Sequence, residues 1–167
     1  MTSPGRGRIL VGTAGWADPT LIRSKRFYPP EAKTPEERLR FYASQFSMVE
    51  VDSTFYGIPP IDNAILWAQR TPPGFVFDVK AFRLFSLHQT PLKVLPSEVR
   101  GEAEAFANSR GNVYLEELPD GLVSDLWQRF RDSVAPLRSA GKLGYILLQF
   151  PQWVTKRRHN LRYIEKA

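Results

Sequence analysis

The sequence predicts an α/β fold in which parallel strands are joined by helices. Short apolar runs typical of strands alternate with segments whose apolar residues recur at helical spacing. No shift in composition marks a linker, and 43% hydrophobic with 24% charged residues is ordinary for one globular core. Strand–helix–strand order favours parallel pairing through helical crossovers. Two architectures fit this order, an open doubly wound sheet and a closed (β/α) barrel.

Four runs are predicted to be strands. Residues 8–12 form a short apolar run that ends in glycine, and residues 143–150 form a longer run that ends at a proline. Residues 48–52 and 75–80 lie between them and carry charged side chains among apolar ones. Residues 81–119 are interrupted by proline and glycine, and we expect that segment to be irregular apart from one short helix.

Capping signals and apolar spacing predict the helices. Residues 34–37 read Thr-Pro-Glu-Glu, which supplies a threonine cap, a proline at the first helical position and a glutamate three residues after the cap. Apolar residues then recur at i, i+3, i+4 and i+7. Similar spacing predicts helices over 60–70 and 121–141, with Pro136 kinking or restarting the second one. Residues 160–167 are predicted to begin a further helix.

Composition limits the chemistry that the chain can perform. Lys and Arg outnumber Asp and Glu by 23 to 17, giving a net charge of +6, and part of this excess lies at the two ends. We interpret residues 1–7 as a basic, solvated tail ahead of a domain at 8–167, because no nucleic-acid motif accompanies the charge. Without cysteine, disulfides, thiolate zinc sites and thiol nucleophiles are excluded. We recognise neither a signal peptide nor a membrane span, and expect a cytoplasmic protein without membrane partners.

Polar residues on the predicted strands define a candidate catalytic site. Glu50 and Asp52 share one face of their strand, and Asp78 and Lys80 share one face of the next. Burying such charges costs free energy unless they are paired or used in chemistry. Glu50, Lys80 and Asp52 are therefore candidates for acid/base catalysis. Alternatively, Glu50 and Lys80 form a structural ion pair and Asp52 caps a turn.

Residues just beyond the strand ends are candidates to bind a ligand. Aromatic side chains there would wall a pocket, and hydroxyl, amide and imidazole groups would form hydrogen bonds. The alternatives are rim or core packing for the aromatics and a surface position for the histidine. No metal set is assigned, since the spacing of Glu50, Asp52 and His88 is not diagnostic. The candidate ligand-binding residues are Trp16, Ser53, Phe55, Tyr56, His88 and Gln149.

Several motifs, in order, resemble one family. They read GTAGW at 12–16, FYP at 27–29, VEVDSTFY at 49–56, FVFDVK at 75–80 with a histidine at 88, and GKLG to LQFP over 141–151. Together they resemble the domain-of-unknown-function 72 family, also called YecE-like. The resemblance implies a TIM-type (β/α) barrel and no particular activity. A full barrel takes about 250 residues, so we expect about four β/α units here, a partial barrel corresponding to the N-terminal half of a family member.

Three classes of function remain open. The first is an enzyme that binds a small polar or phosphorylated ligand at the C-terminal mouth of the barrel, with Glu50 and Lys80 in acid/base roles. The second is a nucleic-acid-binding protein or a metal-dependent phosphodiesterase resembling the endonuclease IV type, for which two histidines are few. The third is a non-catalytic binding or scaffold protein. Open strand edges would favour pairing with a second copy or a complementary half. No flavin or nicotinamide fingerprint is present, so no cofactor is assigned.

Overall fold

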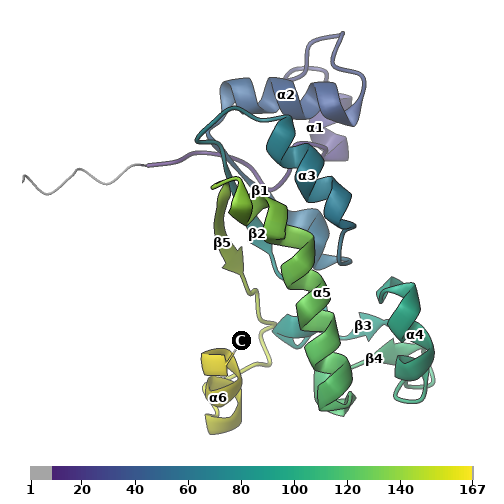
Figure 1. Ribbon diagram of the computed structural model, residues 1–167. Helices are drawn as coiled ribbons and strands as arrows, with labels where there is room; N and C mark the ends of the chain where they lie inside the picture. Colours follow the sequence, from purple (N-terminus) through teal and green to yellow (C-terminus); the bar gives the residue numbers. More distant parts are fainter. Residues whose placement is uncertain (1–8, 167) are drawn as a thin grey trace, which may run out of the picture.

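The computed structural model describes residues 9–166 and contains a parallel sheet with helices on one side (Figure 1). The sheet order is β1-β2-β5, formed by β1 (Met48–Val51), β2 (Val76–Lys80) and β5 (Leu143–Leu147). Both pairings are parallel, so β2 is the central strand. The predicted α/β class is confirmed, and within residues 9–166 the sheet does not close on itself. The helices are α1 (Pro19–Ser24), α2 (Pro35–Gln45), α3 (Ile61–Gln69), α4 (Ser97–Glu104), α5 (Asp120–Ser139) and α6 (Arg158–Lys166).

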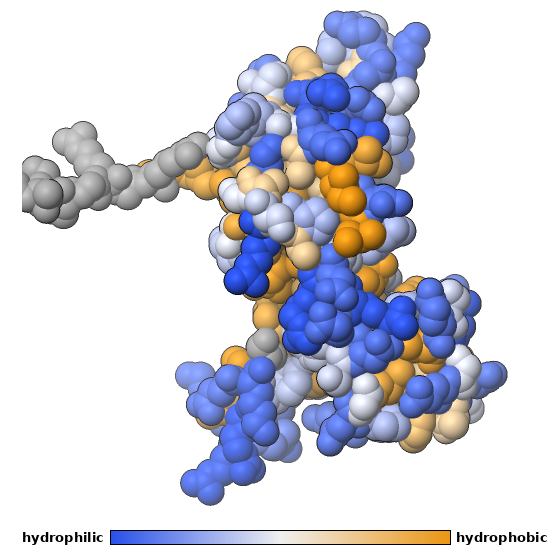
Figure 2. Space-filling view, viewed as in Figure 1, coloured by the Kyte–Doolittle hydropathy of each residue, from blue (hydrophilic) through white to orange (hydrophobic). Residues whose placement is uncertain are grey.

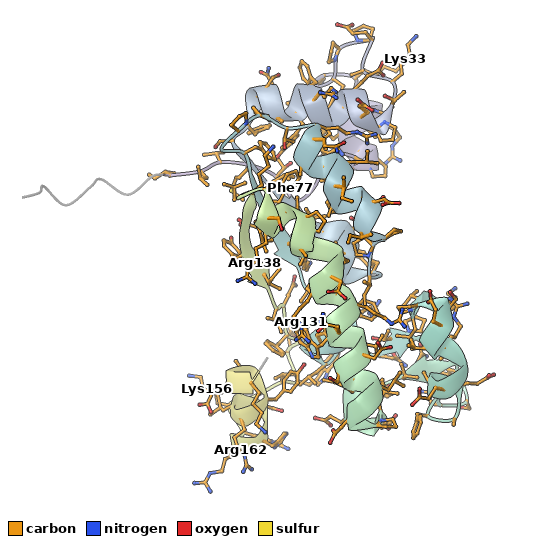
Figure 3. All side chains as sticks on the ribbon, in the orientation of Figure 1. Lys33, Phe77, Arg131, Arg138, Lys156 and Arg162 are labelled. Carbon is orange, nitrogen blue, oxygen red and sulfur yellow. The ribbon has the colours of Figure 1, made fainter. Side chains whose placement is uncertain are left out.

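The hydrophobic core lies between the sheet and the helices. Alternate residues of β1 and β2 point into it, as the two-residue period of a strand requires. Phe77, which is labelled in Figure 3, comes from the central strand and is fully buried. Its ring stacks on that of Trp67 from α3 with ring centres 6.3 Å apart. From α5, residues spaced by three or four positions complete the layer, as expected for one face of a helix. These are Leu122, Leu126, Phe130, Val134 and Leu137.

Helix termini largely follow the predicted signals. The Thr34 hydroxyl accepts from the Glu37 backbone N–H at 3.2 Å, and the Glu37 carboxylate accepts from the Thr34 N–H at 2.8 Å, so the capping box forms. Of the two predicted effects of Pro136, a restart of the helix is wrong, because α5 continues unbroken to Ser139. Pro136 lies in the last turn, where the single lost hydrogen bond is tolerated.

Hydrogen bonds from a buried lysine connect the end of α3 to the start of β5. The Lys142 ammonium donates to the carbonyl oxygens of Ala68 and Thr71, both at 2.6 Å, and to the Thr71 hydroxyl at 2.9 Å. These carbonyls are at the helix C-terminus, where a positive charge is favourable. Burial lowers the pKa of the Lys142 ammonium. Lys142 therefore has a structural role.

Residues 9–12 do not form the predicted first strand, whereas Arg8 and the predicted tail at 1–7 lie outside the described residues. The segment still runs beside β1, because the Thr13 carbonyl accepts from the Glu50 N–H at 3.0 Å. A side chain at Gly12 would meet the Met48 carbonyl oxygen at 2.2 Å, so only glycine permits this approach. No other backbone hydrogen bond joins residues 9–13 to β1 among the described residues, and the Thr13 N–H donates to the Tyr42 hydroxyl at 2.7 Å, so a regular ladder is absent.

Three further features differ from the sequence prediction. Helix α1 was not predicted, although Asp18 caps it and Pro19 begins it. The last strand ends at Leu147, three residues earlier than expected from the run over 143–150. A short antiparallel pair, β3 (Thr90–Pro91) with β4 (Asn112–Val113), orders the segment predicted to be irregular.

No helix among residues 9–166 is long and apolar enough to cross a membrane.

A bulge in β5 accommodates a buried carboxylate of the central strand. Phe77 faces Leu143 and Val79 faces Ile146, so Gly144 and Tyr145 together face Asp78. The Asp78 carboxylate is buried and accepts from the Tyr145 N–H at 3.2 Å. A Cβ atom at Gly144 would lie 2.1 Å from an Asp78 carboxylate oxygen.

We predict that Gly144→Ala destabilises the protein by about 1–3 kcal/mol, because the added methyl displaces the Asp78 carboxylate. Urea unfolding monitored by circular dichroism measures this change. Gly121→Ala is the matched control, since no heavy atom lies within 4 Å of its added Cβ in α5. The control should stabilise the protein by up to about 1 kcal/mol. Equal stabilities of the Gly144→Ala chain and the wild type would contradict the packing around Asp78.

Candidate functional site

The carboxyl ends of β1 and β2 meet at an ion pair. Lys80, the last residue of β2, places its Nζ 2.6 Å from a carboxylate oxygen of Asp52. The two side chains are 12% and 32% exposed, so solvent reaches the pair but does not surround it. Lys80 is therefore paired with Asp52 and not with Glu50, the partner considered from the sequence. Glu50 lies opposite Asp78 in the sheet.

The pairing with Asp52 depends on a bend at the end of β1. After Val51 the chain enters a 3₁₀ turn, Asp52–Phe55, so Asp52 leaves the strand. The buried Thr54 hydroxyl lies 2.7 Å from the Val51 carbonyl oxygen and 2.6 Å from that of Lys80. It therefore ties the turn to the end of β2. Thr54 was not among the predicted site residues.

Two cationic side chains and a histidine lie against the ring of Phe55. The Lys80 Nζ lies 4.7 Å from the ring centre and the Arg83 Cζ lies 5.5 Å from it. The imidazole of His88 meets the same ring edge-on at 5.1 Å, and Tyr56 does so at 5.2 Å. Ammonium and guanidinium groups at such distances are attracted by the ring quadrupole. We call Asp52, Phe55, Lys80, Arg83 and His88 the mouth cluster.

Arg83 is the member of the mouth cluster that the sequence reading missed. Its Nε is buried and has no hydrogen-bond partner among the described residues. Its guanidinium also forms no ion pair with a carboxylate in residues 9–166. Arg83 begins the short turn Arg83–Ser86, three residues after β2 ends. This position could have identified Arg83 as a site residue from the sequence, because residues just past a parallel strand lie at the end of the sheet where the carboxyl ends of the strands meet.

His88 connects the mouth cluster to the chain after β5. Its Nε2 lies 2.9 Å from the backbone carbonyl oxygen of Gln149. A carbonyl oxygen only accepts, so Nε2 carries the proton and Nδ1 is the acceptor in the neutral ring. The indole of Trp153 lies 5.9 Å from the imidazole and is 66% exposed. Gln149 thus contributes through its backbone, and its side chain is exposed.

Two acidic residues lie nearer the middle of the strands than the mouth cluster does. Glu50 is half-buried and pairs in register with the buried Asp78. The nearby Asp78 carboxylate, then partial burial and then the charge of Glu50 raise the pKa of the Tyr145 phenol. Tyr145 is 57% exposed on the sheet face away from the helices. This face therefore has acids in the middle of the strands and cations at their carboxyl ends.

The remaining predicted site residues lie outside the mouth cluster or at its rim. Trp16 belongs to the core, with its ring centre 5.5 Å from that of Trp67 and 6.3 Å from that of Phe77. Ser53 is exposed in the turn, where its carbonyl accepts from the Tyr56 N–H at 3.1 Å. The structure thus brings Asp52, Phe55, Tyr56, Lys80 and His88 together but separates Trp16 from them. In residues 9–166, no group of three or more His, Cys, Asp or Glu side chains is arranged to hold a metal ion.

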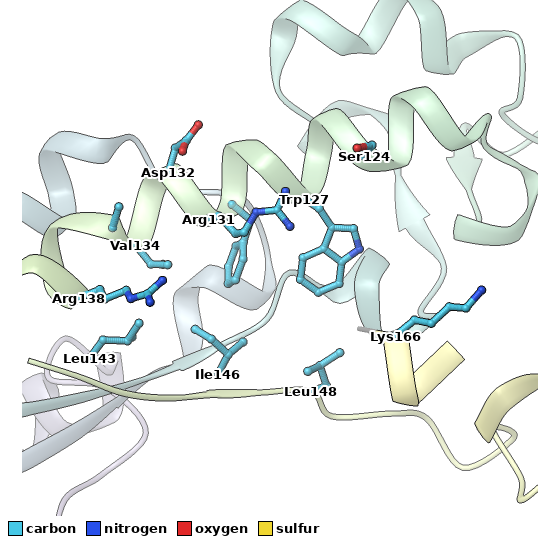
Figure 4. A pocket seen from close by; sticks show the side chains of 12 residues that line it. Ser124, Trp127, Arg131, Asp132, Val134, Arg138, Leu143, Ile146, Leu148 and Lys166 are labelled. Atoms are coloured by element: carbon cyan, nitrogen blue, oxygen red, sulfur yellow. The ribbon is translucent and has the colours of Figure 1, made fainter. Parts of the chain in front are cut away.

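A large groove lies elsewhere, between α5 and β5 (Figure 4). It encloses about 690 Å³, and Trp127, Val134 and Leu148 are among its apolar lining residues. It opens on the helix side of the sheet and does not include the mouth cluster. A second cavity of about 190 Å³ adjoins the mouth cluster through Trp153 and Leu87. The groove is therefore a separate surface feature.

The fold and the mouth cluster define an α/β protein with polar residues at the carboxyl ends of parallel strands. The chain belongs to the family described as protein of unknown function DUF72, whose model matches residues 10–167. The family resemblance of the sequence motifs is thereby confirmed.

Known relatives are considerably longer. The UPF0759 protein YunF of Bacillus subtilis (strain 168) is 30% identical over 156 residues, covering 93% of this chain and 44% of YunF. Two crystal structures of a DUF72 family protein from Enterococcus faecalis V583 align with TM-scores of 0.64 and 0.57 at 23% and 22% identity. They match 95% and 94% of this chain but only 46% and 45% of that protein. The chain thus spans less than half the length of these relatives, and the structural match shows the fold alone.

We predict that Asp52 and Lys80 stabilise the fold jointly. In a double-mutant cycle with Asp52→Ala and Lys80→Met, the coupling energy should be about 1–3 kcal/mol, because the pair is partly desolvated. The control cycle uses Asp125→Ala and Arg129→Ala, which remove a more exposed pair at 2.9 Å. Its coupling should be about 0.3–0.5 kcal/mol. Equal coupling energies in the two urea-unfolding cycles would mean that the Asp52–Lys80 pair is an ordinary surface contact.

Proposed function

We propose that the mouth cluster binds the anionic group, a phosphate or a carboxylate, of a small polar ligand. The observation that carries this proposal is Arg83, whose guanidinium has a buried, unpartnered Nε among the described residues and lies over the ring that also faces Lys80. Within residues 9–166, Asp52 is the one carboxylate that forms an ion pair with a cation of the cluster. An arginine held in this way is suited to bidentate recognition of phosphate or carboxylate.

The proposed chemistry is acid/base catalysis on the polar part of that ligand. With its anionic group at Arg83, the ligand would reach back over the open sheet face toward Glu50. Glu50 is half-buried beside Asp78, and Lys80 is oriented by its hydrogen bond to Asp52. We retain Glu50 and Lys80 as the acid/base candidates, with Asp52 as the residue that holds the Lys80 ammonium in place. Tyr56 and Trp153, both exposed, are suited to wall the ligand.

We further propose that this sheet is part of a (β/α) barrel, with the mouth cluster at its C-terminal face. The parallel order β1-β2-β5 and the helices on one side of the sheet support this architecture. Barrel enzymes carry their chemistry at the C-terminal ends of the strands, which is where Asp52, Lys80 and Arg83 lie. The metal-dependent phosphodiesterase alternative receives no support from a ligand cluster in residues 9–166.

The first experiment measures binding of inorganic phosphate by isothermal titration calorimetry at constant ionic strength. Arg83→Gln should weaken phosphate binding by about tenfold or more, since a hydrogen bond to a charged group contributes about 1.5–3 kcal/mol. Phosphate should also raise the melting temperature of the wild-type protein by mass action. Arg110→Gln is the control, because Arg110 is exposed in a turn outside the mouth cluster.

Two results would contradict the proposal. One is phosphate binding that Arg83→Gln and Arg110→Gln weaken equally, which would indicate a general attraction to a basic protein. The other is the absence of phosphate binding together with a loss of stability in Arg83→Gln. In that case Arg83 packs on Phe55 for structural reasons, and the scaffold interpretation gains support.

A further inference from the structure

The cavity of about 190 Å³ beside the mouth cluster is walled by two segments that are distant in sequence. Leu87 and residues 114–116 line it from one segment, and residues between Trp153 and Asn160 line it from the other. Pockets that hold a whole drug-sized ligand usually enclose about 300–1,000 Å³. This cavity is therefore sized for one part of a ligand, such as a single ring.

The turn that carries Arg83 also positions this cavity. The turn Arg83–Ser86 ends at Leu87, which has a left-handed backbone at φ 64° and lines the cavity. His88, a member of the mouth cluster, follows directly. Helix α6 is fixed to the same turn, because the Tyr163 hydroxyl donates to the Phe85 carbonyl oxygen at 2.5 Å. A ligand held at Arg83 is therefore placed to extend into the cavity.

A buried amide lines the cavity with one of its two polar groups unused. Asn160 is 6% exposed, and its Nδ2 donates to the Thr155 carbonyl oxygen at 2.8 Å. A carbonyl oxygen only accepts, so this contact fixes the orientation of the amide. Within residues 9–166, the Asn160 Oδ1 accepts no hydrogen bond. A buried acceptor without a partner is unfavourable, so a ligand group that donates to Oδ1 would gain free energy.

The other polar groups of the cavity include both acceptors and donors. The Glu116 carboxylate accepts, and it forms no ion pair within residues 9–166. Arg157 and His159, both exposed, supply N–H donors. A hydroxyl group both donates and accepts, so a ring with several hydroxyl groups suits this mixture. The indole of Trp153 offers a flat apolar surface on which such a ring can pack.

The surroundings of the cavity favour a polar ring over an apolar one. Helix α6, which contributes His159 and Asn160, is mainly hydrophilic on the face shown in Figure 2. An aromatic or aliphatic ring would take water away from Glu116 and from the Asn160 Oδ1 without replacing its hydrogen bonds. Burying polar groups in that way costs free energy.

We propose that the ligand of the mouth cluster is an anionic sugar, a sugar phosphate or a sugar acid, whose hydroxylated ring occupies this cavity. Its phosphate or carboxylate binds Arg83, so this inference rests on the proposed function. One ring hydroxyl donates to the Asn160 Oδ1 and another donates to the Glu116 carboxylate. The ring packs on the Trp153 indole.

Isothermal titration calorimetry on the full chain at constant ionic strength tests this inference with two series of compounds. The first is glucose 6-phosphate, cyclohexyl phosphate and inorganic phosphate, and the second is glucuronate, cyclohexanecarboxylate and acetate. In at least one series the sugar should bind about tenfold or more tighter than the other two compounds, because hydrogen bonds to its hydroxyl groups add to the contact with Arg83. The series in which this occurs identifies the anionic group.

Two substitutions separate the contacts of the ring from those of the anion. Glu116→Ala and Asn160→Ala should each weaken sugar binding by about fivefold or more and leave binding of inorganic phosphate unchanged. Glu117→Ala is the matched control, because Glu117 is an exposed neighbour outside the cavity lining and its loss changes the net charge equally. Glu116 is itself exposed, so Glu116→Ala should fold even where Asn160→Ala lowers stability.

The outcomes distinguish this inference from the proposed function. If phosphate binding depends on Arg83 but each sugar binds no tighter than its hydroxyl-free ring, the sugar inference alone is overturned. Equal loss of sugar binding in Glu116→Ala and Glu117→Ala would also overturn it. If Arg83→Gln changes the binding of neither inorganic phosphate nor the sugars, the proposed function fails and this inference fails with it.

Discussion

The parallel pairing of β2 with both of its neighbours is the constraint on which the site depends. It aligns the carboxyl ends of strands that are distant in sequence and thereby brings Asp52 to Lys80 and Arg83. It also buries the Asp78 carboxylate between its neighbouring strands, where the charge needs a partner. The bulge at Gly144 and Tyr145 supplies one through a backbone N–H. The central strand therefore determines both the mouth cluster and the local shape of β5.

The charges on the open sheet face are separated along the strands. Acids lie in the middle, at Glu50 and Asp78, while cations gather at the carboxyl ends around Phe55. The Phe55 ring attracts cations through its quadrupole but carries no net charge. It therefore holds Lys80 and Arg83 near one another without cancelling their positive charges. Lys80 has Asp52 as a counter-ion, whereas Arg83 has none among the described residues. This asymmetry is the basis of the proposal that Arg83 binds an anion.

Local signals in the sequence predicted the elements that depend on neighbouring residues. The capping box at Thr34 and Glu37 and the strand over 75–80 are examples. The prediction failed where distant contacts decide the structure. The Thr13 N–H beside β1 donates to the Tyr42 hydroxyl of α2 and not to a strand, and Thr90 pairs with Val113 across a segment that looks irregular in sequence.

The site was predicted in part for the same reason. Strand parity placed Asp52 and Lys80 near the carboxyl ends of neighbouring strands, and Phe55 was expected just beyond the first of them, but the parity argument assumed that β1 stays extended through Asp52. The chain bends into a 3₁₀ turn after Val51, which directs Asp52 to Lys80. That bend is held by Thr54 bonding across to the end of β2, a contact that no local pattern reveals.

The most direct test of this account is nuclear magnetic resonance of the arginine Nε–H groups during titration with inorganic phosphate. The account predicts a saturable shift of the Arg83 signal, with little change at the exposed Arg110. Equal shifts across the basic residues of α6, with Arg83 unchanged, would contradict the mouth cluster as the anion site.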